Sequence, residues 1–482
     1  MSVTFDLVIR NVDVVDGSGA PRFRADVAVD GQRIARIGDL AEAAGHEEVL
    51  ATGLCLAPGF IDSHTHDDRV LLSSGDMQPK VSQGVTTIIG GNCGISLAPM
   101  PSPQSPPVPP LDLLDAQGSW YRYKRFSDYL KALSAQPAAT NCAMLVGHTT
   151  LRVIEMDNVL RPASAAEMAR MQSHVAEAME AGAIGVSTGL AYAPAASATT
   201  AEVIEVCRPL TSHQGLYCTH MRDEGDAVME SLEETFLIGR ELQVPVLISH
   251  HKLVGQANYG RSVETLELIA QQMQKQSVCL DCYPYDASST ILTLKLANSS
   301  KRTVVTWSQS LPEFAGTDLD EVMRKLGCSM EDAISRLQPA GAVYFRMEER
   351  DVSRILQFEE TMVGSDGLPH DEVPHPRLWG TFPRVLGPYS RDLGLFPLEK
   401  AVHKMTGLTA MRFGLAGRGL LREGYAADMV LFDPLTVGDR ATFENPTRPA
   451  VGIHTVWTNG TPVWSCGRIT GQRPGQLLRR TP

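Results

Sequence analysis

The chain has 482 residues, of which 43% are hydrophobic and 20% are charged, and its formal net charge is -12. This apolar content suffices for a large core, and a chain of this length usually forms more than one domain. Because the charge is acidic and no basic runs occur, we do not expect nucleic acid as a partner.

The sequence shows no pattern typical of a secreted or membrane protein. The opening segment MSVTFDLVIR has charges within its apolar stretch, unlike a signal peptide. No segment approaches the ~20 consecutive apolar residues that span a bilayer. The nine cysteines form no regular framework, which favours a reducing compartment. We therefore expect a cytoplasmic protein without a membrane partner, and the sequence leaves its oligomeric state open.

The two ends of the chain share a β-rich pattern. The first part alternates short apolar runs with turn residues, as in FDLVIR and DVAVDGQRIARIG. The tail repeats this pattern in AADMVLFDP and HTVWTNGTPVW. We predict that residues 1–57 and 418–482 together form one small β-sandwich domain.

The middle of the chain alternates strand-like and helix-like segments, which predicts an α/β fold. The helix-like segments have apolar residues at three- and four-residue spacing. Eight strand-like runs imply a parallel (β/α)8 barrel over residues 58–417. An irregular stretch, about 287–341, is interpreted as an insertion after the seventh strand that covers the site. The eight runs are APGFIDSHTH, TTIIGGNCG, AMLVGH, AIGVSTG, GLYCTH, VPVLISHHK, SVCLDCYPY and TMVGSDG.

Potential metal ligands fall at the carboxyl ends of these runs, where barrel enzymes place their active sites. Each residue alone has an ordinary explanation, such as a surface histidine pair or a buried inert cysteine. Together, at one end of a barrel, they predict a metal site. The candidate residues are His64 and His66 after the first strand, Cys93 after the second, His220 after the fifth, His250 after the sixth and Asp366 after the eighth.

At these residues the chain resembles the D-aminoacylases, the N-acyl-D-amino-acid deacylases of the amidohydrolase superfamily. The resemblance includes GNCGIS, HMRDEG, ISHHK, DCYPYDASST and GSDGLPHDEVPHPRLWGTFPRVLG, and it runs nearly end to end. It implies a barrel with a small β-sandwich, and a zinc enzyme that hydrolyses linear amides of small N-acyl-D-amino acids. Cyclic-amide hydrolases are a weaker alternative, because their metal-bridging lysine is absent from the fourth strand, IGVSTGLAY.

The resemblance also implies roles for individual residues. Cys93, His220 and His250 would hold one tight Zn²⁺, and His64 and His66 would contribute to a second, weaker position. Asp366 would act as general base and then general acid, or else serve as a structural metal ligand. The residues implied in substrate binding are Lys252, Tyr283 and Arg377 at the α-carboxylate, with Tyr192, Ser289, Leu296, Tyr344 and Met347 elsewhere.

The side-chain preference of the substrate depends on the insertion. Relatives specific for D-glutamate have an arginine in a P-E-R stretch, whereas this region reads SSTILTLKLANSSKR. We therefore predict a preference for apolar side chains such as those of D-methionine, D-leucine and D-phenylalanine. Lys295, next to Leu296, keeps N-acyl-D-glutamate and N-acyl-D-aspartate open as alternatives. A non-catalytic scaffold is not expected, since every required ligand type is present.

Overall fold

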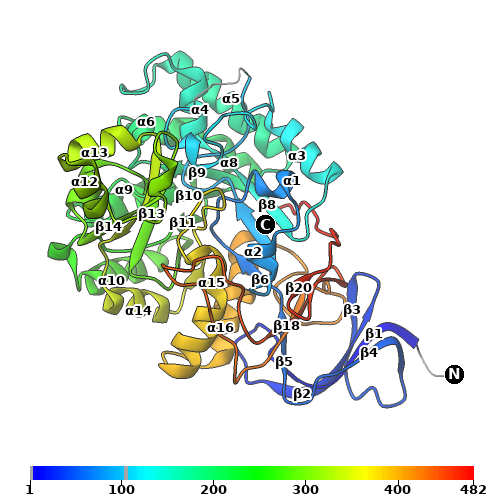
Figure 1. Cartoon of the computed structure of the whole chain (residues 1–482). Coiled ribbons are helices and arrows are strands. Elements are labelled where there is room, and N and C mark those ends of the chain that lie inside the picture. Colours follow the sequence, from blue (N-terminus) through cyan, green and yellow to red (C-terminus); the bar gives the residue numbers. More distant parts are fainter. Residues whose placement is uncertain (1–3, 102–106, 482) are drawn as a thin grey trace.

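The computed structural model describes residues 4–101 and 107–481. Its largest part is an eight-stranded parallel barrel surrounded by helices (Figure 1). A nine-stranded sheet, drawn in blue and red in Figure 1, lies beside the barrel and takes strands from both ends of the chain. A third, three-stranded sheet belongs to the segment between the seventh and eighth barrel strands.

The barrel strands match the eight runs predicted from sequence. They are hydrogen-bonded in the order β16-β12-β11-β10-β9-β8-β7-β6. Almost all of their residues are buried, as expected for a parallel sheet covered by helices. The strands are β6 (Phe60–Asp62), β7 (Val85–Gly90), β8 (Asn141–Gly147), β9 (Gly185–Gly189), β10 (Leu216–His220), β11 (Val246–Ile248), β12 (Val278–Cys282) and β16 (Thr361–Val363).

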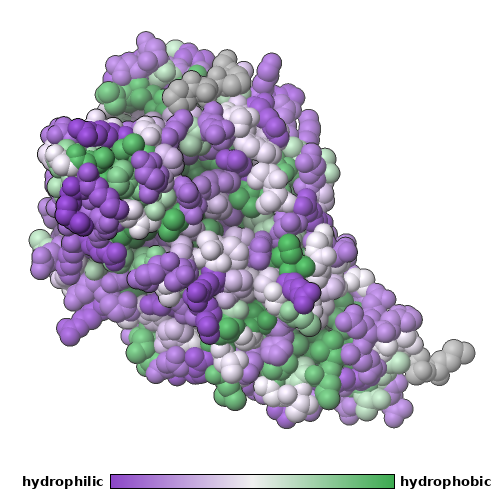
Figure 2. Space-filling model, viewed as in Figure 1, coloured by the Kyte–Doolittle hydropathy of each residue, from purple (hydrophilic) through white to green (hydrophobic). Residues whose placement is uncertain are grey.

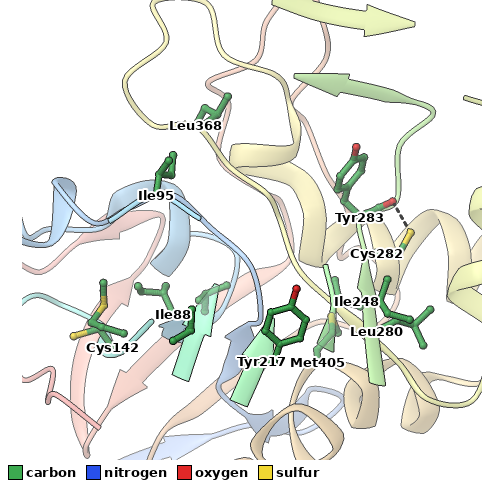
Figure 3. Close-up of a cluster of buried hydrophobic side chains, with 14 of the residues drawn as sticks. Ile88, Ile95, Cys142, Tyr217, Ile248, Leu280, Cys282, Tyr283, Leu368 and Met405 are labelled. Atoms are coloured by element: carbon green, nitrogen blue, oxygen red, sulfur yellow. Dashed lines mark hydrogen bonds between the residues drawn. The ribbon is translucent and has the colours of Figure 1, made fainter. Parts of the chain in front are cut away.

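Successive residues of these strands pack into two different apolar clusters, because side chains alternate across a strand. Ile88, Tyr217, Ile248 and Leu280 belong to the cluster that also contains Met405 of a surrounding helix (Figure 3). Their immediate neighbours Ile89, Cys218, Leu247 and Cys279 belong to a second cluster. The strands are therefore apolar on both faces, which explains the nearly continuous apolar runs in the sequence.

The barrel closes between its two terminal strands without a regular ladder. The backbone N–H of Ser63 donates to the carbonyl of Val363 at 3.4 Å. Just beyond the strands, the N–H of Asp366 donates to the carbonyl of His64 at 2.7 Å, and His66 donates to Gly367 at 3.1 Å. We call residues 62–67 and 363–367 the closing seam. It lies at the carboxyl end of the barrel, among the residues expected to carry the chemistry.

Helices follow most of the barrel strands. The helix at 165–181 has the capping box that its sequence predicts, in which Ser164 and Glu167 bind each other's backbone N–H. The helices are α1 (Val70–Ser73), α2 (Gln78–Val81), η1 (Leu111–Leu113), α3 (Phe126–Ala135), α4 (His148–Glu155), α5 (Ala165–Ala181), α6 (Ala193–Ala196), α7 (Thr200–Cys207), α8 (Pro209–His213), α9 (Val228–Leu242), η2 (Gln256–Asn258), α10 (Ser262–Met273), α14 (Glu349–Gln357), α15 (Arg377–Arg384), the π-helix η4 (Val385–Asp392), α16 (Leu398–Met405) and α17 (Gly407–Phe413).

The nine-stranded sheet joins the two ends of the chain around a separate apolar core. Its central strand β5 pairs with β1 from the N-terminal part and with β17 from the C-terminal part. The fold class predicted from sequence is therefore confirmed, while the exact domain bounds stay predictions. The strands are β1 (Thr4–Val14), β2 (Phe23–Asp30), β3 (Arg33–Gly38), β4 (Ala44–Leu50), β5 (Cys55–Pro58), β17 (Met429–Phe432), β18 (Ile453–Thr458), β19 (Thr461–Ser465) and β20 (Arg468–Ile469).

The insertion after β12 is regular, although its sequence reads as irregular. It forms an antiparallel sheet in the order β13-β15-β14 with helices and its own apolar core. The physical reason is that short elements with separate caps, such as Asp318 and Ser329, give a weak periodic signal. The elements are β13 (Ala287–Ile291), α11 (Leu294–Asn298), β14 (Arg302–Ser308), η3 (Pro312–Phe314), α12 (Leu319–Leu326), α13 (Met330–Leu337) and β15 (Ala340–Phe345).

The surface is mainly polar. Figure 2 shows hydrophilic side chains over most of one face, with smaller apolar areas between them. Exposed large apolar residues such as Leu50, Leu160 and Leu435 are far apart in the sequence. Within the described ranges, no helix is both long enough and apolar enough to cross a membrane.

Candidate active site

The ends of β6, β7, β11 and β16 bring four potential ligands to one point. Donor atoms of His64, Cys93, His250 and Asp366 all lie within 4.8 Å of one another, and all four residues are buried. Cys93 Sγ lies 3.2 Å from His64 Nε2 and 3.3 Å from His250 Nε2. Cys93 is thus placed between the histidine of the first strand and the histidine of the sixth.

The other two predicted ligands, His220 and His66, each lie against a different member of this cluster. His220 Nδ1 lies 3.0 Å from His250 Nε2, and His66 Nε2 lies 3.2 Å from Asp366 Oδ1. The structure therefore brings together all six residues proposed from sequence. Their division into one tight and one weaker metal position stays a prediction.

The chemistry of these donors fits zinc. Zinc binds thiolate, imidazole and carboxylate groups, and ligand sets that mix cysteine with histidine are typical of it. Burial lowers the pKa of His220 to about 3 and that of His64 well below its usual value, so these imidazoles keep their lone pairs. Burial also raises the pKa of the Cys93 thiol, and a bound cation would displace its proton.

Three of these residues have a backbone conformation that non-glycine residues rarely adopt. The φ angles of Cys93, His250 and Asp366 are 52°, 37° and 49°. Such left-handed conformations cost energy and concentrate at functional sites. The turn after β7 also depends on Gly91, where an added Cβ would lie 1.9 Å from the carbonyl oxygen of Leu145. These turns direct the side chains inward from the strand ends.

Asp366 is ion-paired to a buried arginine. Arg377 Nη1 lies 2.9 Å from Asp366 Oδ2, and Arg377 Nη2 donates to the carbonyl of Ser289 at 3.1 Å. Burial opposes ionisation of Asp366, but Arg377 and the nearby histidines hold the pKa of its carboxyl well below the usual range. The carboxylate is therefore charged and able to accept a proton. The guanidinium also lies 4.7 Å from the ring centre of Tyr283.

A second buried ion pair supports the histidines. Lys252 Nζ donates to Glu224 Oε1 at 2.6 Å and lies 2.7 Å from His250 Nδ1. Glu224 Oε2 also lies 3.9 Å from His220 Nε2. Burial opposes its charge, but Lys252 and both histidines hold the pKa of Glu224 well below its usual value. The sequence identifies Lys252 as a candidate but does not reveal that Glu224 is its partner.

Asp281 supports the site from the end of β12 and was not among the residues singled out from sequence. It is fully buried, and its carboxylate accepts hydrogen bonds from His250 N at 2.5 Å and Ser63 Oγ at 3.2 Å. It also lies 3.8 Å from His64 Nδ1. Burial raises the pKa of Asp281 to about 7. In the sequence, the position of Asp281 directly before the CYPY run was the available signal. A sequence position does not show which hydrogen bonds a carboxylate accepts.

A small cavity adjoins the cluster and contains four of the predicted substrate-binding residues. These are Tyr192, Lys252, Tyr283 and Ser289. The structure places the other side-chain candidates elsewhere: Leu296 and Tyr344 pack in the apolar core of the insertion, and Lys295 is exposed. Met347 is buried with its sulfur 3.9 Å from Tyr283 Oη.

Sequence reasoning missed several residues that line this cavity. Leu113 and Leu368 supply apolar surface, and Ser288 and Arg346 supply polar groups. Arg346 Nε donates to Ser288 Oγ at 3.1 Å. Arg346 directly follows β15, so recognising it would have required the fold of the insertion. Leu113 lies in the short helix η1, which carries no catalytic motif.

A (β/α)8 barrel with histidine, cysteine and carboxylate donors at the carboxyl ends of its strands defines a metal-dependent hydrolase. The amidohydrolase family profile matches residues 47–324 and 359–464. A D-aminoacylase of Alcaligenes xylosoxydans xylosoxydans is 60% identical over 480 residues, covering 100% of this chain and 99% of that protein. The chain belongs to the amidohydrolase family, and within it to the D-aminoacylases.

Related deacylases and solved structures are similar over the same length. An N-acyl-D-aspartate deacylase from that organism is 53% identical, covering 98% of this chain and 95% of that protein. A D-aminoacylase structure described by its binuclear metal centre has a TM-score of 0.96 and 57% identity, covering 99% and 100% of the two chains. The Bordetella bronchiseptica N-acyl-D-glutamate deacylase, complexed with zinc and a phosphonate inhibitor, has a TM-score of 0.95 and 44% identity over the same shares.

The position of Cys93 between two histidines generates a prediction about metal binding. We expect Cys93→Ser to weaken zinc binding by more than about 100-fold, because a soft thiolate is lost from the centre of the cluster. Competition with a chromophoric chelator measures this affinity. Cys466→Ser is the matched control, because that cysteine is exposed and distant in sequence from the site. Equal zinc affinity in the two variants would remove Cys93 from the ligand set.

Proposed function

We propose that this protein is a zinc-dependent deacylase that hydrolyses N-acyl-D-amino acids to a carboxylate and a free D-amino acid. The observation that carries the proposal is the buried convergence of His64, Cys93, His250 and Asp366 beside a small cavity with cationic groups. The nine free cysteines and the acidic charge support a cytoplasmic location.

Asp366 is suited to move the proton that amide hydrolysis requires. Zinc, when bound to the donor cluster, supplies Lewis-acid activation of the amide carbonyl and of the attacking water. Asp366 accepts the water proton and then delivers it to the departing nitrogen as the C–N bond breaks. Its ion pair with Arg377 keeps the carboxylate ionised before the reaction begins.

The α-carboxylate of the substrate needs a cationic or hydroxyl partner in the same cavity. Lys252 and Tyr283 line the cavity, and Arg377 lies against the ring of Tyr283. Arg377 Nε has no hydrogen-bond partner among the described residues, which leaves it a donor for an anion. Holding the carboxylate, the amide and the side chain at three places would select one enantiomer.

The proposal is tested by the release of amine from three substrates. We expect the zinc-loaded enzyme to hydrolyse N-acetyl-D-methionine at least about 100-fold faster than N-acetyl-L-methionine, because only one enantiomer places all three groups. The rate with N-acetyl-D-glutamate, measured in parallel, shows whether the side-chain pocket accepts an acidic group. No turnover of any D-substrate by protein with stoichiometric zinc would refute the deacylase function and favour a cyclic amide as substrate.

The role of Asp366 is tested separately from metal binding. We expect Asp366→Asn to lower kcat by about 10²–10⁴-fold, because the amide cannot accept the water proton. Zinc content of the purified variant is measured at the same time. Stoichiometric zinc with the low kcat indicates an acid/base role, whereas loss of zinc in proportion to activity indicates a structural ligand.

Acidic side chains are a second candidate substrate class, favoured by Arg346. This arginine lines the cavity, is half-buried, and makes no ion pair with a carboxylate in the part of the chain that the structure describes. By contrast, Lys252 and Arg377 are already paired to Glu224 and Asp366. A guanidinium can bind a carboxylate through two parallel hydrogen bonds. Leu113 and Leu368 favour apolar groups in the same cavity, so both classes are tested together.

Replacing Arg346 separates the two classes. We expect Arg346→Leu to lower kcat/KM for N-acetyl-D-aspartate and N-acetyl-D-glutamate by about 10–100-fold, since one charge-assisted contact is lost. Turnover of N-acetyl-D-methionine should stay within about threefold. Lys295→Leu serves as control because that lysine is exposed. An equal loss for acidic and apolar substrates would show that Arg346 does not read the side chain.

A further inference from the structure

Lys80 of α2 is a buried lysine whose contacts all reach the closing seam. Its side chain is completely inaccessible to solvent. The ammonium donates to Asp62 Oδ2 at 2.7 Å, to Thr65 Oγ1 at 2.8 Å and to Ser365 Oγ at 2.8 Å. It also lies 3.1 Å from Asp67 Oδ2. Three donated hydrogen bonds use the full donor capacity of an ammonium group.

The charge of Lys80 is maintained by its partners. Burial by itself opposes the charged form, but Asp62 and Asp67 outweigh it and raise the pKa of Lys80. Both carboxylates are also inaccessible to solvent or nearly so. A buried ion pair of this kind contributes little net stability compared with apolar packing, and such groups are often retained because they specify one conformation. In this chain, the conformation that the Lys80 ion pair specifies is the arrangement of the closing seam.

The partners of Lys80 come from both sides of the seam and are bonded to one another across it. Asp62 Oδ1 accepts from the backbone N–H of Ser365 at 2.8 Å, and Asp62 Oδ2 accepts from Ser365 Oγ at 2.6 Å. Asp62 also accepts from the N–H of His64 at 3.3 Å. Ser365 Oγ in turn accepts from Gly367 N at 3.1 Å. His64 directly precedes Thr65, and Asp366 directly follows Ser365, so two partners of Lys80 are sequence neighbours of predicted metal-site residues.

We propose that Lys80 is a positioning residue that fastens the closing seam and fixes the separation between His64 and His66 on one side and Asp366 on the other. Neighbouring strands elsewhere in the barrel are joined by regular ladders, whereas β6 and β16 are not. The two sides of the reaction centre are therefore held together here by side chains as well as by a few backbone contacts. Lys80 itself does not reach the cavity.

The chain offers a matched control in a second buried lysine. Lys404 of α16 is also inaccessible to solvent, and among the described residues its ammonium bonds only backbone carbonyls: those of Phe358, Glu359 and Thr361. Thr361 begins β16, whereas Ser365 follows its end. The two lysines thus support opposite ends of the same strand, and only Lys80 does so beside the reaction centre.

The experiment compares Lys80→Met with Lys404→Met in the full-length zinc protein. For Lys80→Met we expect the zinc position that includes His64 and His66 to bind 10–100-fold more weakly, the range typical of groups that orient metal ligands. We also expect kcat for N-acetyl-D-methionine at saturating zinc to fall at least about tenfold, with KM within about threefold. For Lys404→Met the zinc affinity and kcat should stay close to those of the native protein, even where the melting temperature of the variant is lower.

Other outcomes are equally decisive. Zinc affinity and kcat in Lys80→Met that match those of Lys404→Met would overturn the proposal. If Lys80→Met does not fold, Ser365→Ala removes the hydroxyl that joins Lys80, Asp62 and Gly367 and keeps the charges of the network balanced; native zinc affinity in that variant would also overturn the proposal. The kinetic readout rests on the proposed deacylase function, but the zinc titration does not. If the native protein has no deacylase activity, the zinc titration by itself still tests the role of Lys80.

Discussion

The arrangement of this molecule depends on one electrostatic constraint, namely that imidazoles, a thiol and a carboxylate converge in a largely buried space. Cys93 lies within 3.3 Å of His64 Nε2 and His250 Nε2, and Asp366 lies within 3.5 Å of His64 Nε2 and His66 Nε2. Side chains without mutual complementarity gather at such distances when a cation is bound between them. The left-handed backbone at Cys93, His250 and Asp366 is the conformational cost of this convergence.

Charge balance around the centre follows the same constraint. Four buried carboxylates near the donors are paired with a cation: Asp366 with Arg377, Glu224 with Lys252, and Asp62 and Asp67 with Lys80. A buried charge without such a partner would lose its ionised form. Asp281 has no lysine or arginine partner within the described ranges and accepts hydrogen bonds instead, and burial raises its pKa to about 7.

The donor cluster and part of the cavity lining come from different segments of the chain. The donors come from the ends of barrel strands, which are anchored on both sides by ladders or by the seam. The cavity lining also includes the insertion, through Ser288, Ser289 and Arg346, and the loop helix η1, through Leu113. Related deacylases of acidic D-amino acids share the whole length of this chain. Changes confined to the insertion can alter the side-chain pocket without moving the metal ligands.

The sequence by itself determined the barrel, its eight strands and the six residues of the donor cluster. These were predictable because buried parallel strands give continuous apolar runs and catalytic groups follow their carboxyl ends. The resemblance to the D-aminoacylases also pointed to Lys252, Tyr283 and Arg377 at matching motif positions. The sheet at the two ends could be anticipated, since both ends alternate apolar and turn residues.

Only the tertiary structure decided which distant groups meet. Leu296 and Tyr344 are apolar or aromatic and lie in the insertion, yet they pack into its own core, while Arg346 faces the cavity. The pairing of Lys252 with Glu224, and of Lys80 with both sides of the seam, joins segments up to 285 residues apart. Local patterns report which face of an element is apolar, but such contacts depend on how whole elements pack, and no local pattern encodes that.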